Sequence, residues 1–120
     1  MRIITKRQNN QDNMDNIKEA HITGAIREWL TWHRIFHWKQ WQGLGSKKGV
    51  ADIIGILPDG RFLAIEVKKP GGRLTELQKE FLNAVRHNNG VGIVAYSVDD
   101  VIEVLEPILR DFRKRATSAV

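Results

Sequence analysis

Cysteine is absent from the 120 residues of this chain. Its absence excludes disulfide bonds and thiolate metal sites, and it favours a reducing compartment. The chain also lacks any apolar run near the roughly 18 residues that a membrane-spanning helix needs. Its N-terminal residues do not contain the apolar segment of a secretory signal. We therefore expect a cytoplasmic protein that has no membrane partner.

Acidic residues are outnumbered: 19 Lys and Arg face 14 Asp and Glu, which gives a formal net charge of +5. A positive excess favours polyanionic partners such as nucleic acids, because binding releases their counterions. Many basic domains bind no polyanion, so the net charge alone does not predict nucleic-acid binding without a candidate site. The length suits one domain with a sizeable core.

The N-terminal segment differs in composition from the rest. Residues 1–14 are polar, rich in Asn and Gln, and without helical or strand periodicity, so we predict a flexible arm. We expect residues 15–120 to form a single domain. Its first helix is predicted to begin at Asp15 or Asn16, which are suitable N-caps, and to end near His33.

The rest of the chain alternates strand and helix signals. The predicted elements are a short strand at 35–41, strands at 50–57 and 61–68, a helix of about a dozen residues opened by Thr75, a strand at 91–96, and a last helix from Ser97 that Pro107 kinks or splits. This order predicts an α/β fold with a mixed sheet flanked by helices.

The two central strands are joined by Leu57-Pro58-Asp59-Gly60, which is typical of a type I turn with glycine in the left-handed region. Such a turn places Leu57 opposite Arg61. Counting back along the ladder places Asp52 opposite Glu66, with Cβ atoms about 5 Å apart.

This register brings charges together in an apolar sheet. Side chains alternate between faces, so Asp52, Glu66 and Lys68 share one face, and both faces of the hairpin are otherwise apolar. Two adjacent carboxylates repel each other, and one lysine compensates only one of them. A divalent cation such as Mg²⁺ would remove the conflict, so we predict a metal site. The alternative is a buried Glu66–Lys68 ion pair with Asp52 solvated at the strand end.

Two further polar residues are candidates for this site. Glu19 lies seven positions before Ile26, which returns the helix to within roughly 20° of the same direction, whereas Glu28 points to solvent. Glu19 is thus a candidate third carboxylate, or it simply favours the positive end of the helix dipole. Gln78 either closes a capping box with Thr75 or joins the site.

The sequence resembles a known family in several segments: KEAHITGAIREWL, KKGVADIIGIL, AIEVKKPGGRLTELQKEFL and GVGIVAYSVDDVIEVL. Together they are similar to the virus-type replication-repair nuclease (VRR-NUC) domain of the PD-(D/E)XK superfamily, over about residues 17–105. Ala51 stands where the superfamily motif has proline, a position that holds no metal. The resemblance implies a PD-(D/E)XK core with helices and strands in the order α-β-β-β-α-β-α.

The resemblance also implies a site and a reaction, the Mg²⁺- or Mn²⁺-dependent hydrolysis of DNA phosphodiester bonds. The implied metal ligands are Asp52, Glu66, the backbone carbonyl of Val67 and, directly or through water, Glu19. Lys68 would orient or deprotonate the attacking water and stabilise the charge that grows on phosphorus. Gln78 matches the glutamine beside the family's site and would position water or phosphate.

Basic residues flank this site in glycine-rich loops: Lys39, Lys47, Lys48, Lys69 and Arg73. They suit contact with the nucleic-acid backbone, although ordinary solvated loops would look the same. Trp38 and Trp41 flank Lys39 and would either stack on bases or fill a subunit interface.

The function that these observations favour is a DNA endonuclease. The resemblance implies branched substrates such as Holliday junctions or flaps, a role in replication, recombination or repair in a bacterial or phage-infected cell, and a homodimer that cuts opposing strands. A catalytically silent nucleic-acid-binding module and a structural partner in a replication or packaging complex are the alternatives. The presence of Asp52, Glu66 and Lys68 favours the enzyme.

Overall fold

The computed structural model describes residues 6–118. Its elements are α1 (Lys6–Trp32), β1 (Phe36–Lys39), β2 (Ile53–Ile56), β3 (Phe62–Val67), α2 (Glu76–His87), β4 (Val91–Ala95) and α3 (Val98–Ser118). The predicted order α-β-β-β-α-β-α is confirmed. No helix within the described range is both long and apolar enough to cross a membrane.

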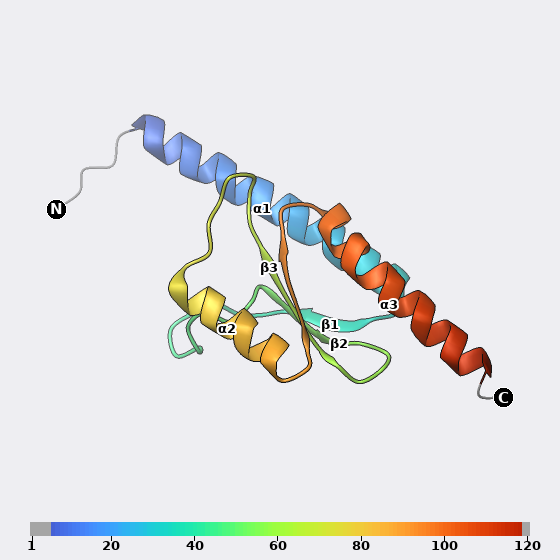
Figure 1. Ribbon diagram of the computed structural model, residues 1–120. Coiled ribbons are helices and arrows are strands. Elements are labelled where there is room, and N and C mark those ends of the chain that lie inside the picture. Colours follow the sequence, from blue (N-terminus) through green and yellow to red (C-terminus); the bar gives the residue numbers. More distant parts are fainter. Residues whose placement is uncertain (1–5, 119–120) are drawn as a thin grey trace.

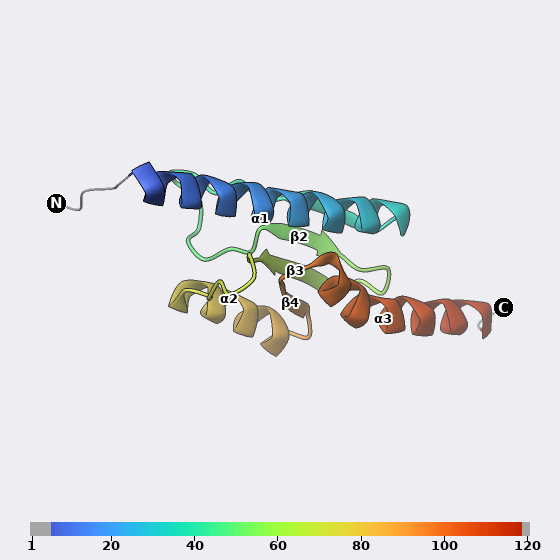
Figure 2. The ribbon, with the colours of Figure 1, turned by 90° about the horizontal axis from the view of Figure 1, so that it is seen from above.

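The strands form one sheet in the order β1-β2-β3-β4. β1–β2 and β2–β3 pair antiparallel, whereas β3 and β4 run parallel, so the predicted mixed sheet is confirmed. The crossover between the parallel strands contains α2, which lies across the sheet from α3 (Figure 1). Seen from above, α1 runs along the sheet on the side opposite α2 (Figure 2).

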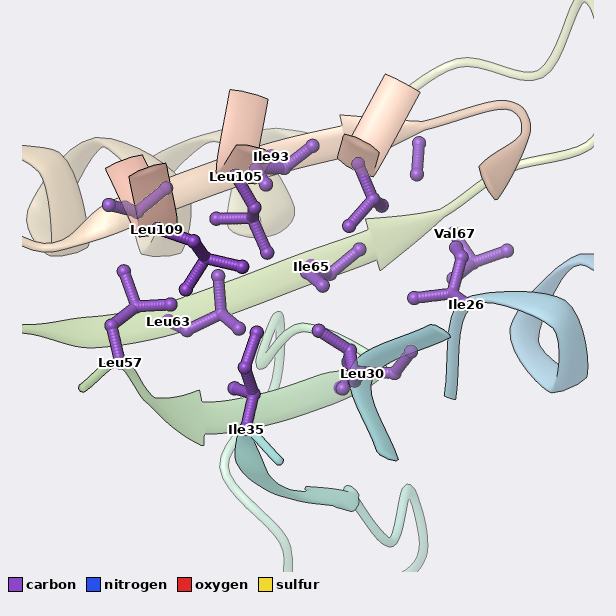
Figure 3. Close-up of a cluster of buried hydrophobic side chains, with 14 residues drawn as sticks. Ile26, Leu30, Ile35, Leu57, Leu63, Ile65, Val67, Ile93, Leu105 and Leu109 are labelled. Carbon is purple, nitrogen blue, oxygen red and sulfur yellow. The ribbon is translucent and has the colours of Figure 1, made fainter. Parts of the chain in front are cut away.

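Alternation along the strands divides the core in two. The larger cluster lies between the sheet and helices α1 and α3 (Figure 3). It includes Ile26 and Leu30 from α1, Ile53 and Leu57 from the first central strand and its end, Leu63, Ile65 and Val67 from β3, and Leu105 and Leu109 from α3. The smaller cluster lies under α2 and contains Ala51, Ile54, Ala64, Leu82 and Val85. Both faces of the hairpin are therefore covered near its middle, as its two-sided apolar pattern predicts.

The register of the central hairpin follows from its turn. Ile53 pairs with Ile65 and Ile56 with Phe62, as the predicted opposition of Leu57 and Arg61 requires. The Leu57 N–H donates to the Arg61 carbonyl at 2.9 Å. Gly60 has a φ of 89°, the left-handed conformation that the turn needs and that glycine adopts without strain. The predicted register is confirmed.

One sequence prediction about the helices is wrong, and a second is wrong in one of its two alternatives. The helix α1 begins at Lys6, so residues 6–14 of the predicted flexible arm are helical, and residues 1–5 lie outside the described range. The N-terminal turns extend beyond the sheet (Figure 1), and Asp15 ties them to the loop after β3 through an ion pair with Lys69. Pro107 does not split α3, which runs unbroken from Val98 to Ser118. The alternative, a kink at Pro107, stays a prediction.

Candidate metal centre

The two central strands bring acidic side chains together at one end of the hairpin. Glu66, the last residue but one of β3, is only 3% exposed, and Asp52 is half-buried directly before β2. Asp52 Oδ2 accepts a hydrogen bond from the Val67 backbone N–H at 2.8 Å, which fixes this carboxylate against the neighbouring strand. The register places Asp52 across the ladder from Glu66, as the sequence predicts.

The two oxygens of Glu66 have different surroundings. Oε1 accepts a hydrogen bond from Gln78 Nε2 at 3.0 Å and lies 3.8 Å from Lys68 Nζ. Oε2 is buried and has no hydrogen-bond partner among the described residues. A buried carboxylate oxygen without a partner is unfavourable, since it has lost water and gained nothing in exchange.

Electrostatics around Glu66 favour a positive charge. Burial is the largest cause that raises the pKa of Glu66, the negative charges of Asp52 and Glu19 add to it, and Lys68 opposes it, so that together they bring this pKa to about 8. A cation bound at this carboxylate would offset the burial and the repulsion together. Without one, the pKa of about 8 means that Glu66 holds a proton at neutral pH.

Helix α1 directs Glu19 towards this end of the sheet. Glu19 is half-buried, and its Oε1 accepts a hydrogen bond from the Lys69 backbone N–H at 3.4 Å, whereas Glu28 is exposed. One turn earlier, the Asp15 carboxylate pairs with the Lys69 ammonium. Asp15 was not among the predicted site residues. Its position four residues before Glu19, on the same helix face, is the signal that identifies it.

Gln78 closes the capping box and also contacts Glu66. Its backbone N–H donates to Thr75 Oγ1 at 3.2 Å, and its side-chain Oε1 accepts from the Thr75 N–H at 2.9 Å, which completes a capping box. The nitrogen of the same amide donates to Glu66. The start of α2 and the acidic centre are thus joined through one side chain.

The donor atoms present suit a hard cation. Within residues 6–118, no group of three or more His, Cys, Asp or Glu side chains is gathered closely enough to hold a metal. Magnesium does not need such a group, since it is commonly held by one or two carboxylates and keeps several waters. The partnerless Glu66 Oε2 beside Asp52 fits that requirement. The ligands predicted in addition are the Val67 carbonyl and Glu19.

The predicted basic residues differ in their positions and in their ion pairs. Lys39 ends β1, and Arg73 is exposed in the loop before α2. Lys47 and Lys48 line a hollow beside α2. None of these four forms an ion pair within the described part of the chain. Lys69 differs, because its ammonium is already paired with Asp15.

Comparisons with known proteins agree with this arrangement. The family model described as the VRR-NUC domain matches residues 3–99. A solved structure titled "VRR_NUC domain" is 21% identical, with a TM-score of 0.63 over 74% of this chain and 95% of that one. A second, "VRR_NUC domain protein", is 23% identical, with a TM-score of 0.52 over 73% and 84% of the two chains. At these identities the structures show a shared fold. The comparison with curated proteins gave no match.

Proposed function

Because the chain belongs to the VRR-NUC family of nuclease domains, we propose that it is a Mg²⁺- or Mn²⁺-dependent endonuclease that hydrolyses DNA phosphodiester bonds in branched DNA. The observation that carries the proposal is the buried, partnerless Glu66 Oε2 next to Asp52. Lys68 balances the charge of only one of the two adjacent carboxylates in this acidic pocket. The basic loops of the chain suit the DNA backbone.

In the proposed centre, Asp52, Glu66 and the Val67 carbonyl would hold the ion, and Glu19 would reach it directly or through water. When bound, such an ion lowers the pKa of a coordinated water and neutralises charge on the phosphate. Gln78 holds one oxygen of Glu66 by donating to it, which keeps the carboxylate in one orientation. The Val67 N–H does the same for Asp52.

Lys68 is the residue proposed to act on the reacting groups. It shares a face with both carboxylates, and its side chain is 16% exposed, so it meets solvent at the rim of the centre. There it would orient the attacking water towards phosphorus. Its ammonium would also stabilise the negative charge that the phosphate oxygens gain as the water attacks. Gln78 would position the water or the phosphate on the α2 side.

Cleavage assays test this proposal. A supercoiled plasmid and a four-way junction should be cut with Mg²⁺ or Mn²⁺ and left intact with EDTA. Asp52→Ala and Lys68→Ala should abolish cutting, while circular dichroism and DNA affinity stay close to those of the unmodified protein. Asp111→Ala and Lys79→Ala are matched controls, since they remove the same charges at exposed ion pairs on α3 and α2.

Two results would contradict the assignment. Robust cutting by either site variant would show that the reaction takes place elsewhere. Binding of DNA without cutting, under every metal condition, would favour the catalytically silent binding module instead.

We also propose that two copies act together on a junction. One chain offers one acidic centre within residues 6–118, whereas resolving a four-way junction needs a cut in each of two opposing strands. Sedimentation of the protein on an uncut junction in EDTA should give two chains per junction. A single chain that makes both cuts would refute this part of the proposal.

A further inference from the structure

An exposed apolar row crosses the sheet on the face that carries the acidic centre. Phe36, Ile56 and Phe62 are register partners on β1, β2 and β3, and Trp38 follows Phe36 on the same face. These four residues, the aromatic patch, are between 41% and 65% exposed. The neighbouring pair Ile54 and Ala64 is buried under α2. The helix therefore covers the middle of this face and leaves the patch open.

The rings of the patch are held in place. Phe36 and Trp38 meet edge to face, with ring centroids 5.7 Å apart. The Trp38 indole N–H donates to Gln40 Oε1 at 3.0 Å, which satisfies its polar atom and fixes the ring. A contiguous apolar patch of this kind on a protein surface commonly marks an interaction site.

The patch lies close to the candidate centre. Trp38 pairs with Ile54, and Asp52 stands two residues before Ile54, a distance of about 7 Å along a strand. The ladder continues up to the centre, since the Gln40 N–H donates to the Asp52 carbonyl at 2.8 Å. A DNA strand with one phosphate at the candidate centre would thus have its neighbouring nucleotides beside β1.

Charges next to the patch suit a nucleic-acid strand. Lys47 and Phe62 line the same hollow of about 430 Å³ beside α2. Lys48 lines the adjoining hollow, where Glu80 is the acidic neighbour. Neither lysine is in an ion pair within the described residues. Exposed aromatic rings beside a positively charged groove are a usual means of binding single strands, whose bases stack on the rings.

The edge strand argues against sheet extension by a second copy of this chain. β1 has only four residues and ends in Lys39, and it stands at the edge of the sheet. A short edge strand with an exposed lysine is a common device against pairing with another sheet. The row of apolar side chains is therefore better suited to flat bases than to an added strand.

We propose that the aromatic patch stacks unpaired bases beside the cleavage site, so that the protein selects phosphates next to unpaired nucleotides. The inference extends the proposed function, and its statement about which phosphates are cut rests on that function. In a duplex the base faces already stack on one another and are not available to protein rings. Trp38, the ring nearest the centre, supplies most of the stacking energy.

Binding in EDTA tests the proposal without any cutting. Fluorescence anisotropy would compare an oligothymidine with a duplex of the same length, for Trp38→Ala, Trp38→Phe and the unmodified protein. Loss of one stacked base should weaken oligothymidine binding about 5- to 100-fold. Duplex affinity should change less than about twofold. Trp38→Phe should recover most of the loss. Trp32→Ala is the matched control, because Trp32 is 79% exposed on α1.

The possible outcomes are distinct. Equal losses for oligothymidine and duplex, or no loss for either, would overturn the inference. So would sedimentation showing that Trp38→Ala converts a dimer to a monomer, since the patch would then be a subunit interface. If the unmodified protein cuts DNA and the Trp38→Ala variant binds oligothymidine normally, only the inference is refuted. Selective binding of unpaired bases by a protein that never cuts supports the inference and refutes the proposed endonuclease.

Discussion

The substitution Glu66→Gln should make the metal-free protein more stable at alkaline pH. Glutamine has nearly the shape of protonated glutamic acid, and its oxygen can accept the hydrogen bond that Gln78 donates to Glu66. Unlike glutamate, it cannot ionise in the buried pocket. The variant therefore retains the contacts of the protonated state and loses its dependence on pH.

The sign and size of the effect follow from the pKa of Glu66. Burial and the charge of Asp52 raise this pKa from 4.5 to about 8, so the folded protein holds the proton more tightly than the unfolded chain does. The stabilisation from that proton is fully present below pH 4.5 and is lost as the pH rises through about 8. At about 1.4 kcal/mol for each pH unit, the full loss is at most about 5 kcal/mol. That is a large part of a typical domain stability of about 5–15 kcal/mol.

Urea unfolding in EDTA measures this difference. The free energy of unfolding should fall from about pH 5 to about pH 8 in the unmodified protein, and it should fall much less in Glu66→Gln. The contribution of ionisable groups away from the centre is common to both proteins and cancels in the comparison. Mg²⁺ added at about pH 8 should restabilise the unmodified protein far more than the variant, because the ion replaces the proton. Parallel pH profiles for the two proteins would refute the reasoning.

Two further predictions concern the contacts around the centre. Gln78→Glu keeps a side chain that can close the capping box but cannot donate to Glu66, so the cleavage rate should fall more than about tenfold. The control Thr75→Ala removes about 1 kcal/mol of capping and should leave the cleavage rate nearly unchanged. Equal effects of the two substitutions on the cleavage rate would contradict this prediction. Gly49→Ala should lower the free energy of unfolding by about 1–3 kcal/mol in urea, because Gly49 has a φ of 83° and the new Cβ would lie 2.5 Å from the Leu77 carbonyl oxygen. An unchanged free energy of unfolding would contradict this prediction and show that the loop can shift to accommodate the Cβ.

The hairpin was predictable because its information is local. Pro58, Asp59 and Gly60 specify the turn, the turn sets the register, and alternation then assigns every side chain to a face. A shift by one residue would have moved Asp52 away from Glu66, and the apolar pattern on both faces resists such a shift. The juxtaposition of these two carboxylates could thus be found without any long-range information.

The N-terminal helix could not be found in this way. Residues 6–14 contain no apolar stripe and several residues of modest helix propensity, so the local pattern gives no sign of a helix. The segment continues a helix whose packing is decided further on, at Ile26 and Leu30. Directly after this segment, Asp15 pairs with Lys69, which lies 54 residues away in the chain. Sequence spacing alone cannot reveal a partner at that distance.

Gln78 shows why the sequence left one choice open. As a capping residue it needs only an acceptor, which glutamate would supply equally well, and as a neighbour of the acidic centre it needs a donor. The amide has both, and the structure uses its oxygen for Thr75 and its nitrogen for Glu66. The two interpretations were never exclusive, because they concern different atoms of one side chain. Glutamine is the residue that serves both, since glutamate in its place would add a further negative charge beside Asp52, Glu66 and Glu19.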